Sequence, residues 1–277
     1  MPAEIRSDGN GGLTYFGVVD TIIPAKRKLP EEYDKYFSRK FFVKNGNAYD
    51  LGYNVGLIRY NDHGDMLYSA IADIEKNERL LMMNYGDSRI ILNNRKFDDI
   101  YDYGFSPAKE IYYAAQTYRK DSISQDEMSY LYIRDKLIGK YDYFSLQYTS
   151  DNPSVLAFDS KNNFAFVATE RIDSINYRNI VVTNNGKLSF PQTKIPGVQE
   201  FSNISYLLFS RNDKMFYIGE AAAPSVEVLT KKEIFVENSF QGDIYDTISS
   251  FVYNAAENKV TFMGSRDKVI YTVTVNF

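Results

Sequence analysis

The 277-residue chain contains no cysteine and no tryptophan, and His63 is its single histidine. The absence of cysteine excludes disulfides, thiolate nucleophiles and cysteine-based zinc or iron–sulfur sites. One histidine excludes any site that needs two imidazoles from this chain. An unpaired thiol is a liability outside the cell, so the lack of cysteine slightly favours an exported protein.

The sequence also lacks an excess of one charge and long apolar runs. Its 32 basic side chains stand against 36 acidic ones, a formal net charge of −4, and the basic residues are scattered. We therefore expect no nucleic-acid binding, which needs a basic patch. No run of about 18 apolar residues occurs, so no membrane span is expected. The first residues do not resemble a signal peptide. We expect a periplasmic, cell-surface or secreted protein whose leader is absent from the chain, with a cytoplasmic protein as the alternative.

Helical patterns are scarce, and strand patterns are frequent. Tyr (24) and Phe (19) supply all the aromatic residues of a chain that is 44% hydrophobic, and both residue types favour strands. The best helical candidate is residues 30–37, where Pro30 stands at a first-turn position. Elsewhere, short apolar or alternating runs are separated by Asn, Asp, Gly and Lys, which predicts strands and turns.

One pattern recurs along the chain: an aromatic residue, a polar turn of about five residues, and a strand of apolar and small residues. Its leading aromatics are Tyr60, Phe105, Phe158, Phe209 and Tyr253, at intervals of 44 to 53 residues. A sixth, degenerate copy covers residues 5–19. Periods of this length, with about four strands each, are typical of β-propeller blades.

We therefore predict an all-β, single-domain β-propeller over residues 1–277, built of four-stranded blades. Six blades are favoured because six units of about 46 residues fill the chain, and five blades are the alternative. A β-sandwich also has closely spaced strands, but the recurrence of whole units favours the propeller. Closure of the ring predicts that the segment near Leu13 to Val19, or its predecessor, pairs with strands of the C-terminal unit.

The repeated segments resemble those of TolB-like and WD-repeat-like bacterial β-propellers. The repeat of these families begins Phe-Ser-Pro-Asp-Gly-Lys and continues into a small-residue strand. Phe105-Ser106-Pro107 matches its opening, and Phe209-Ser210 matches its first two residues. The Asp-Gly of the turn is poorly preserved. The resemblance covers about residues 40–277, and it implies a fold rather than an activity.

An aromatic-Asp pair precedes the first strand of most units: Tyr49-Asp50, Phe97-Asp98, Tyr141-Asp142 and Tyr245-Asp246. Phe201-Ser202 is the altered copy. In a propeller, Asp50, Asp98, Asp142 and Asp246 would surround one channel mouth and could bind a divalent cation or a sugar hydroxyl. The alternative interpretation is structural: the aromatic packs between blades, and the Asp caps a turn.

An insertion at residues 143–153 interrupts the unit that contains Phe158. It carries aromatic side chains beside hydroxyls and amides, which suits a glycan or peptide ligand. Tyr143, Tyr148 and Asn152 are its candidate ligand-binding residues; a solvated loop is the alternative.

No residues are assigned to catalysis or to a metal. His63 lies in a turn, no Gly-x-Ser-x-Gly motif occurs, and residues 61–65 do not match a calcium loop. Acidic candidates for glycoside hydrolysis are Asp98, Asp102, Asp142, Glu200 and Asp246. The sequence favours a non-enzymatic binding or scaffold propeller that recognises a protein, peptide or glycan at the channel mouth, without a cofactor. A glycosidase or a metal-dependent lactonase-like hydrolase is the alternative.

Overall fold

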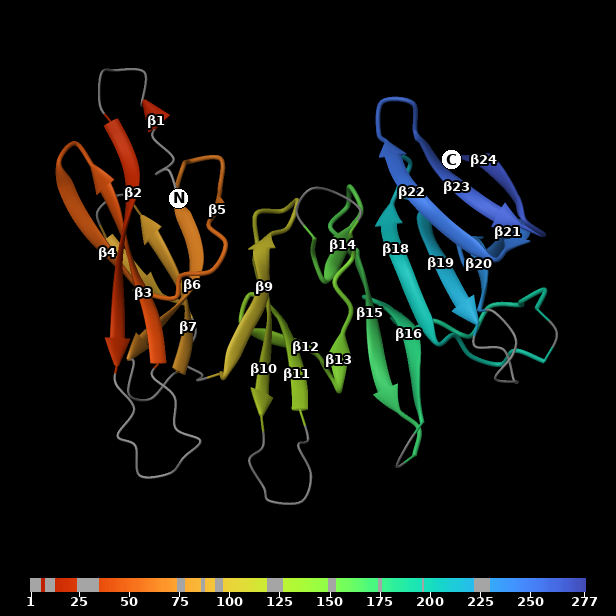
Figure 1. Ribbon diagram of the computed structural model, residues 1–277, viewed down its shortest axis with the longest axis horizontal. Coiled ribbons are helices and arrows are strands. Elements are labelled where there is room, and N and C mark those ends of the chain that lie inside the picture. Colours follow the sequence, from red (N-terminus) through yellow and green to blue (C-terminus); the bar gives the residue numbers. More distant parts are fainter. Residues whose placement is uncertain are drawn as a thin grey trace. The chain divides into compact units, whose positions relative to one another are not determined.

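The computed structural model describes residues 6–7, 13–23, 35–73, 78–85, 88–92, 97–118, 127–148, 153–173, 176–195, 197–221 and 230–277. The prediction of an all-β fold is confirmed, since every regular element in these ranges is a strand and the pairs are antiparallel (Figure 1). Of the helical candidate 30–37, residues 30–34 lie outside the described ranges. Lys35, Tyr36 and Phe37 begin strand β3, so the helix prediction is wrong there.

The chain forms two compact units, of which the first comprises residues 1–104 and 115–117. Its main sheet has the order β1-β2-β3-β4-β6-β7-β8, and β5 pairs with β6. A single residue pair, Tyr53 with Ile71, joins β1–β4 to the later strands. The strands of this sheet are β1 (Arg6–Ser7), β2 (Leu13–Ile23), β3 (Lys35–Lys44), β4 (Asn47–Tyr53), β5 (Arg59–Tyr60), β6 (Met66–Asp73), β7 (Glu78–Tyr85) and β8 (Ser88–Ile91).

The second unit comprises residues 105–114 and 118–277. The sheet β12-β11-β10-β9 is divided between the units, because residues 99–104 of β9 and 115–117 of β10 belong to the first unit. The other later sheets have the orders β13-β15-β16-β17 with β14 also on β15, β18-β19-β20-β21, and β22-β23-β24. The strands of all these later sheets are β9 (Asp99–Phe105), β10 (Ile111–Tyr118), β11 (Glu127–Ile133), β12 (Lys136–Tyr141), β13 (Tyr143–Phe144), β14 (Leu156–Phe158), β15 (Phe164–Arg171), β16 (Tyr177–Thr183), β17 (Gly186–Lys187), β18 (Asn203–Phe209), β19 (Met215–Ala221), β20 (Lys231–Val236), β21 (Ser239–Tyr245), β22 (Thr247–Asn254), β23 (Lys259–Arg266) and β24 (Val269–Asn276).

Four turns between the first and second strands share one geometry. They are residues 61–65, 106–110, 159–163 and 210–214. In each turn the first residue's side-chain oxygen accepts the N–H of the fifth residue, at 2.7 to 3.2 Å. The fourth residue has a positive φ: Gly64, Lys109, Asn162 and Asp213. Asn, Asp and Ser supply the short side-chain acceptor that this turn needs, which explains the residue that follows each leading aromatic.

A small residue in the second strand lets an aromatic ring pack directly on the backbone. A Cβ added to Gly219 of β19 would lie 2.5 Å from the ring of Phe201, and one added to Gly264 of β23 would lie 2.5 Å from the ring of Tyr245. Phe201 is 1% exposed and joins the cluster that packs against β15. The small residues of these internal strands are therefore required by packing rather than by strand propensity.

The chain ends pair locally. Leu13–Ile23 pairs with β1 and β3, and the C-terminal sheet is β22-β23-β24. One edge of β2 pairs with β3, and on the other edge the described pairs with β1 involve Leu13 and Thr14. The prediction that the segment near Leu13 to Val19, or its predecessor, pairs with the C-terminal unit stays a prediction. The single-domain and six-blade predictions stay predictions.

Replacing Gly219 by Ala is expected to lower the free energy of unfolding by about 1–3 kcal/mol, because the new methyl group overlaps the Phe201 ring. The measurement is urea denaturation. Gly17→Ala is the matched control, since its Cβ meets no described atom within 4 Å. Adding Phe201→Leu to Gly219→Ala should recover part of the loss. Equal stability of the Gly219 and Gly17 variants would contradict the packing argument.

Candidate binding site

An insertion splits the first strand of the sheet β13-β15-β16-β17. Tyr143 and Phe144 pair with Thr169 and Ala168, and Leu156 resumes the pairing at Phe166. On β15, Val167 alone separates these two sets of pairs, and its carbonyl accepts the Ser145 N–H at 3.0 Å. The corresponding strands β18 and β22 have only a β-bulge at this place. The insertion therefore stands where β18 and β22 have a bulge, and such bulges are over-represented next to active sites.

The base of the insertion is anchored to both neighbouring sheets. Gln147 is 4% exposed, and its Oε1 accepts the N–H of Leu207 in β18 at 2.9 Å. The backbones of Gln147 and Ser154 exchange two hydrogen bonds, of 2.8 and 3.2 Å. Ser154 also shares a hydrogen bond of 2.9 Å with the hydroxyl of Tyr112 in β10. These contacts fix the ends of the loop, so its described side chains are presented from a rigid base.

The two candidate tyrosines project from this base. Tyr148, next to the anchored Gln147, is 66% exposed, and Tyr143 is 45% exposed. Asn152, the third candidate residue of the insertion, lies outside the described residues. Two partly exposed aromatic side chains therefore flank the anchored residue Gln147 in sequence.

Asp142 and Asp246 occupy equivalent positions before the first strands of two sheets. Each carboxylate accepts a backbone N–H at the end of the second strand: that of Arg171, the last residue of β15, at 2.9 Å for Asp142, and that of Asp267, just after β23, at 3.0 Å for Asp246. Asp246 is also paired with Lys231, and this hydrogen bond lowers the pKa of Asp246. Both carboxylates therefore hold their own sheets, and a role in ligand binding stays a prediction.

The other two aspartates, Asp50 and Asp98, belong to the first unit. Asp98 is at the same position as Asp142 and Asp246, because its N–H donates to Gln116 as that of Asp246 donates to Ser265. Asp50 is not at this position. The pair Tyr53 with Ile71 places Gly52 there instead, and Asp50 forms an ion pair of 2.5 Å with Arg39.

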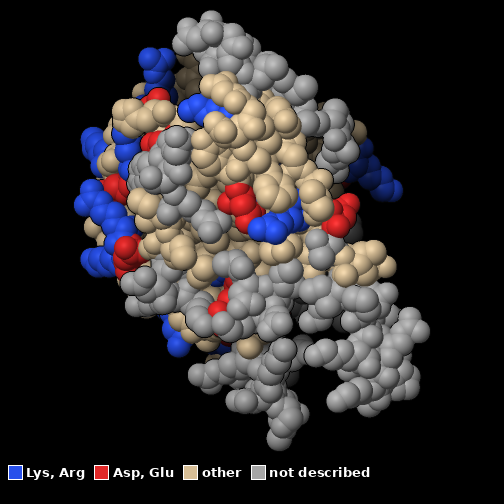
Figure 2. Space-filling view, turned by 90° about the vertical axis from the view of Figure 1, so that its left-hand side faces the viewer, with Lys and Arg blue, Asp and Glu red and all other residues tan. Residues whose placement is uncertain are grey.

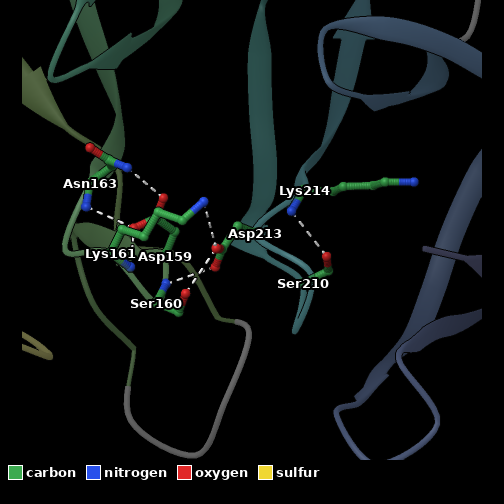
Figure 3. A network of polar contacts seen from close by, with 7 residues as sticks. All are labelled: Asp159, Ser160, Lys161, Asn163, Ser210, Asp213 and Lys214. Carbon is green, nitrogen blue, oxygen red and sulfur yellow. Dashed lines mark hydrogen bonds and ion pairs between the residues drawn. The ribbon is translucent and has the colours of Figure 1, made fainter.

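Successive turns of the second unit are linked by polar side chains. Figure 3 shows Asp213 of one turn accepting the N–H and the hydroxyl of Ser160 from the preceding turn, both at 2.8 Å. Lys161 lies 3.6 Å from the same carboxylate. The N–H of Arg211 donates in turn to Tyr253 and Asn258 of the last sheet, at 2.7 and 2.9 Å. The backbone hydrogen bond from Ser160, followed by that of its hydroxyl, lowers the pKa of Asp213.

The remaining candidates gain no further support. His63 is exposed in its turn. Among the described residues, no three His, Asp or Glu side chains are grouped so that they could hold a metal ion. In the part of the chain that the structure describes, no helix is long and apolar enough to cross a membrane. Figure 2 shows a face of the first unit on which basic residues gather at one edge, with acidic residues among them, and uncharged residues form much of the described remainder.

The sequence is matched by no protein-family model and by no curated protein. The solved structures to which the chain is similar include the β-propeller domain of the Trilobed protease from Pyrococcus furiosus, described as having an open velcro topology. The identity is 11%, 99% of this chain and 82% of that chain are covered, and the TM-score is 0.45.

Pyrococcus horikoshii acylaminoacyl peptidase is 12% identical over 99% of this chain and 45% of that chain, with a TM-score of 0.47. TolB from Acinetobacter baumannii is 9% identical over 94% of this chain and 64% of that chain, with a TM-score of 0.37. The chain thus spans less than two thirds of these two proteins. These structures include β-propellers, TolB among them, and thus support the TolB-like resemblance of the sequence. Their TM-scores are below 0.5, so they support no inference about activity or ligand.

Sequence reasoning missed Gln147, the buried anchor of the insertion, and the connection 188–200 between β17 and β18. A glutamine inside a polar loop gives no signal of burial. The connection does carry a signal, because Phe190-Pro191 follows the Asn185-Gly186 turn and no strand pattern intervenes before Phe201.

Replacing Gln147 by Leu is expected to cost about 1–3 kcal/mol of stability, because the buried N–H of Leu207 loses its acceptor. Urea denaturation measures the loss, and amide hydrogen exchange should show faster exchange at Leu207. Gln241→Leu, at an exposed position of β21, is the control. Unchanged exchange at Leu207 would show that Gln147 does not anchor the insertion.

The lowered pKa values of Asp213 and Asp246 predict acid sensitivity of the second unit. A carboxyl whose folded pKa lies below its unfolded value of about 3.9 stabilises the fold at higher pH, and the contribution is lost as pH falls through the folded pKa. Urea midpoints measured from pH 7 to pH 3 should therefore fall, and Asp213→Asn should flatten this dependence. Asp135→Asn, in the β11–β12 turn, removes the same charge; equal flattening by both variants would contradict the assignment.

Proposed function

We propose that the chain is a non-enzymatic binding module that recognises a protein partner through Tyr148 of the insertion and the adjacent Tyr143 of β13. The observation that carries the proposal is the contrast between Gln147, 4% exposed and hydrogen-bonded to the next sheet, and its neighbour Tyr148, 66% exposed. A large aromatic side chain held on a fixed base loses little conformational freedom on binding. Tyrosine is enriched among the residues that dominate protein interfaces.

The proposal includes a β-propeller architecture with six units. Strands β1–β4, β5–β8, β9–β12, β13–β17, β18–β21 and β22–β24 supply six successive groups, of which the last has three strands. The common turn geometry and the common position of Asp98, Asp142 and Asp246 support equivalent units. Five units remain the alternative, because β1–β8 count as one sheet. In a propeller the first strands line the central channel, so the insertion would open at the channel mouth.

The same proposal places the protein in the periplasm or at the cell surface, where a chain without cysteine is protected from unwanted thiol chemistry. A cytoplasmic protein is the alternative, and cell fractionation separates the two locations.

The test is selection of ligands for the purified chain from a displayed random-peptide library and, in parallel, from a glycan array. We expect peptides whose affinity falls at least tenfold on Tyr148→Ala and severalfold on Tyr143→Ala, since removal of an aromatic anchor costs about 1–2 kcal/mol or more. Tyr36→Ala is the matched control, because Tyr36 is 70% exposed on β3, outside the insertion. Selected peptides that bind the tyrosine variants as well as the wild type would contradict the proposal. Glycans alone, bound through Tyr148, would replace the protein partner by a carbohydrate.

A further inference from the structure

A pocket of about 290 Å³ lies between the β16–β17 hairpin and strands β18 and β19. One wall comes from β16 and the residues around β17, and the other from the start of β18. The connection from Leu188 to Pro191 borders it, and Asn238, in the turn between β20 and β21, also contributes. All of these residues belong to the second unit. The volume is at the lower end of the range of about 300–1,000 Å³ for small-ligand pockets, so it suits one large side chain or a fragment of similar size.

The floor of the pocket is apolar. Val181, Phe201, Ile204 and Tyr217 line it, and each is 4% exposed or less. The Tyr217 hydroxyl donates to Asn238 Oδ1 at 2.5 Å, so its polar atom is already satisfied. Burial raises the pKa of Tyr217, so this hydroxyl stays neutral. Such a floor offers ring faces and aliphatic groups to an apolar side chain.

Phe190 forms an aromatic rim at the pocket. Its ring lies 4.7 Å from that of Phe201, centroid to centroid, but Phe190 itself is 39% exposed. An apolar group inserted beside it would remove this exposed ring surface from water. The stabilisation is about 25 cal/mol for each Å² of apolar surface buried.

The mouth of the pocket has an excess of positive charge on the β16–β17 side. Arg178 and Lys187 both pair with the single carboxylate of Glu170, which is 15% exposed in its side chain. Burial raises the pKa of Glu170, but the hydrogen bonds from Lys187 and Arg178 outweigh it and leave this pKa below its ordinary value. The two cations are about half exposed and exceed the charge of Glu170 by one. Glu200, three residues before β18, also lines the pocket and carries a negative charge.

The walls are held in place before any ligand binds. Leu188 donates its N–H to Val181 at 2.9 Å, and Asn238 donates to the carbonyl of Ser189 at 3.1 Å. The buried carboxylate of Glu233 accepts the N–H of Lys194 at 2.6 Å, which fixes the connection beyond Pro191. A ligand therefore meets a formed pocket and spends little free energy on ordering it.

We propose that this pocket is a second binding site, which takes a peptide segment with a large apolar side chain next to an acidic residue. The apolar side chain occupies the floor beside Phe190, and the carboxylate lies at the exposed sides of Arg178 and Lys187. Charge complementarity selects this occupant: a basic neighbour would be repelled by the excess positive charge at that wall. The proposal does not depend on the insertion or on its tyrosines.

The chain has no tryptophan, so Phe190→Trp gives a single fluorescent reporter at the pocket rim. The probes are acetyl-Gly-Phe-Asp-Gly-amide and acetyl-Gly-Asp-Phe-Gly-amide, each compared with versions in which Lys replaces Asp or Ala replaces Phe. We expect a saturable change in tryptophan fluorescence, with at least one acidic probe binding tenfold more tightly than both of its altered versions. Calorimetric titration of the unmodified chain should give the same order, which keeps the test valid if the reporter disturbs the pocket.

Two further variants separate this site from the insertion. Lys187→Gln should weaken the acidic probe about fivefold at low salt, and the charge-matched Lys136→Gln should not. Tyr148→Ala should leave the affinity for this probe unchanged. Equal affinity for acidic and basic probes, the absence of any binding by calorimetry, or a loss of binding on Tyr148→Ala would each overturn the proposal.

Discussion

Each later sheet depends on one residue that belongs to two sheets at once. Phe97, Tyr141, Phe201 and Tyr245 are bound by their backbones to the third strand of the preceding sheet, at Arg79, Ser129, Asn179 and Lys232. The rings of Phe201 and Tyr245 lie on the small residues Gly219 and Gly264 of the following sheet. A larger residue at these two glycines would push the ring away and, through the backbone, the preceding strand with it. The aromatic residue before a sheet and the glycine in the second strand of that sheet are therefore both required for this packing.

The turns could be predicted from sequence because their requirements are local. Each turn is closed within five residues, because the side chain of its first residue accepts the N–H of its fifth residue. The acceptor residues Asn61, Ser106, Asp159 and Ser210 therefore mark the turns in the sequence. The aromatic before each of them is equally visible, and Phe105, Phe158 and Phe209 each end a first strand. The all-β class follows from the same signals. Asn and Asp replace the expected glycine at positive φ in two turns because both tolerate the left-handed region.

The register before the first strands could not be read from sequence. Tyr49-Asp50 has the same residue types as Tyr141-Asp142, but an irregularity between Lys40 and Phe41 moves the equivalent position to Leu51 and Gly52. Leu51 is fully buried, and this aliphatic side chain stands at the position that an aromatic residue occupies in the later units. A shift of this kind changes no residue type, and only the pairing with Ile71 reveals it. The partners of Gln147 and Leu13–Ile23 are also set by contacts that composition does not encode.

Function is best sought where these shared requirements are relaxed. Asp142, Asp246 and Asp213 are occupied by backbone and side-chain partners that hold the sheets and turns, so a ligand at these carboxylates would have to displace such contacts. The insertion and the connection 188–200 depart from the repeated strand pattern, and their described anchoring contacts leave Tyr148 and Phe190 exposed. Both contact β18: the Leu207 N–H donates to Gln147 Oε1, while Ile204 and the preceding Phe201 form part of the floor of the pocket. One strand thus supports both departures from regular structure, and the sheet contacts on either side of it supply the rigidity that a binding surface needs.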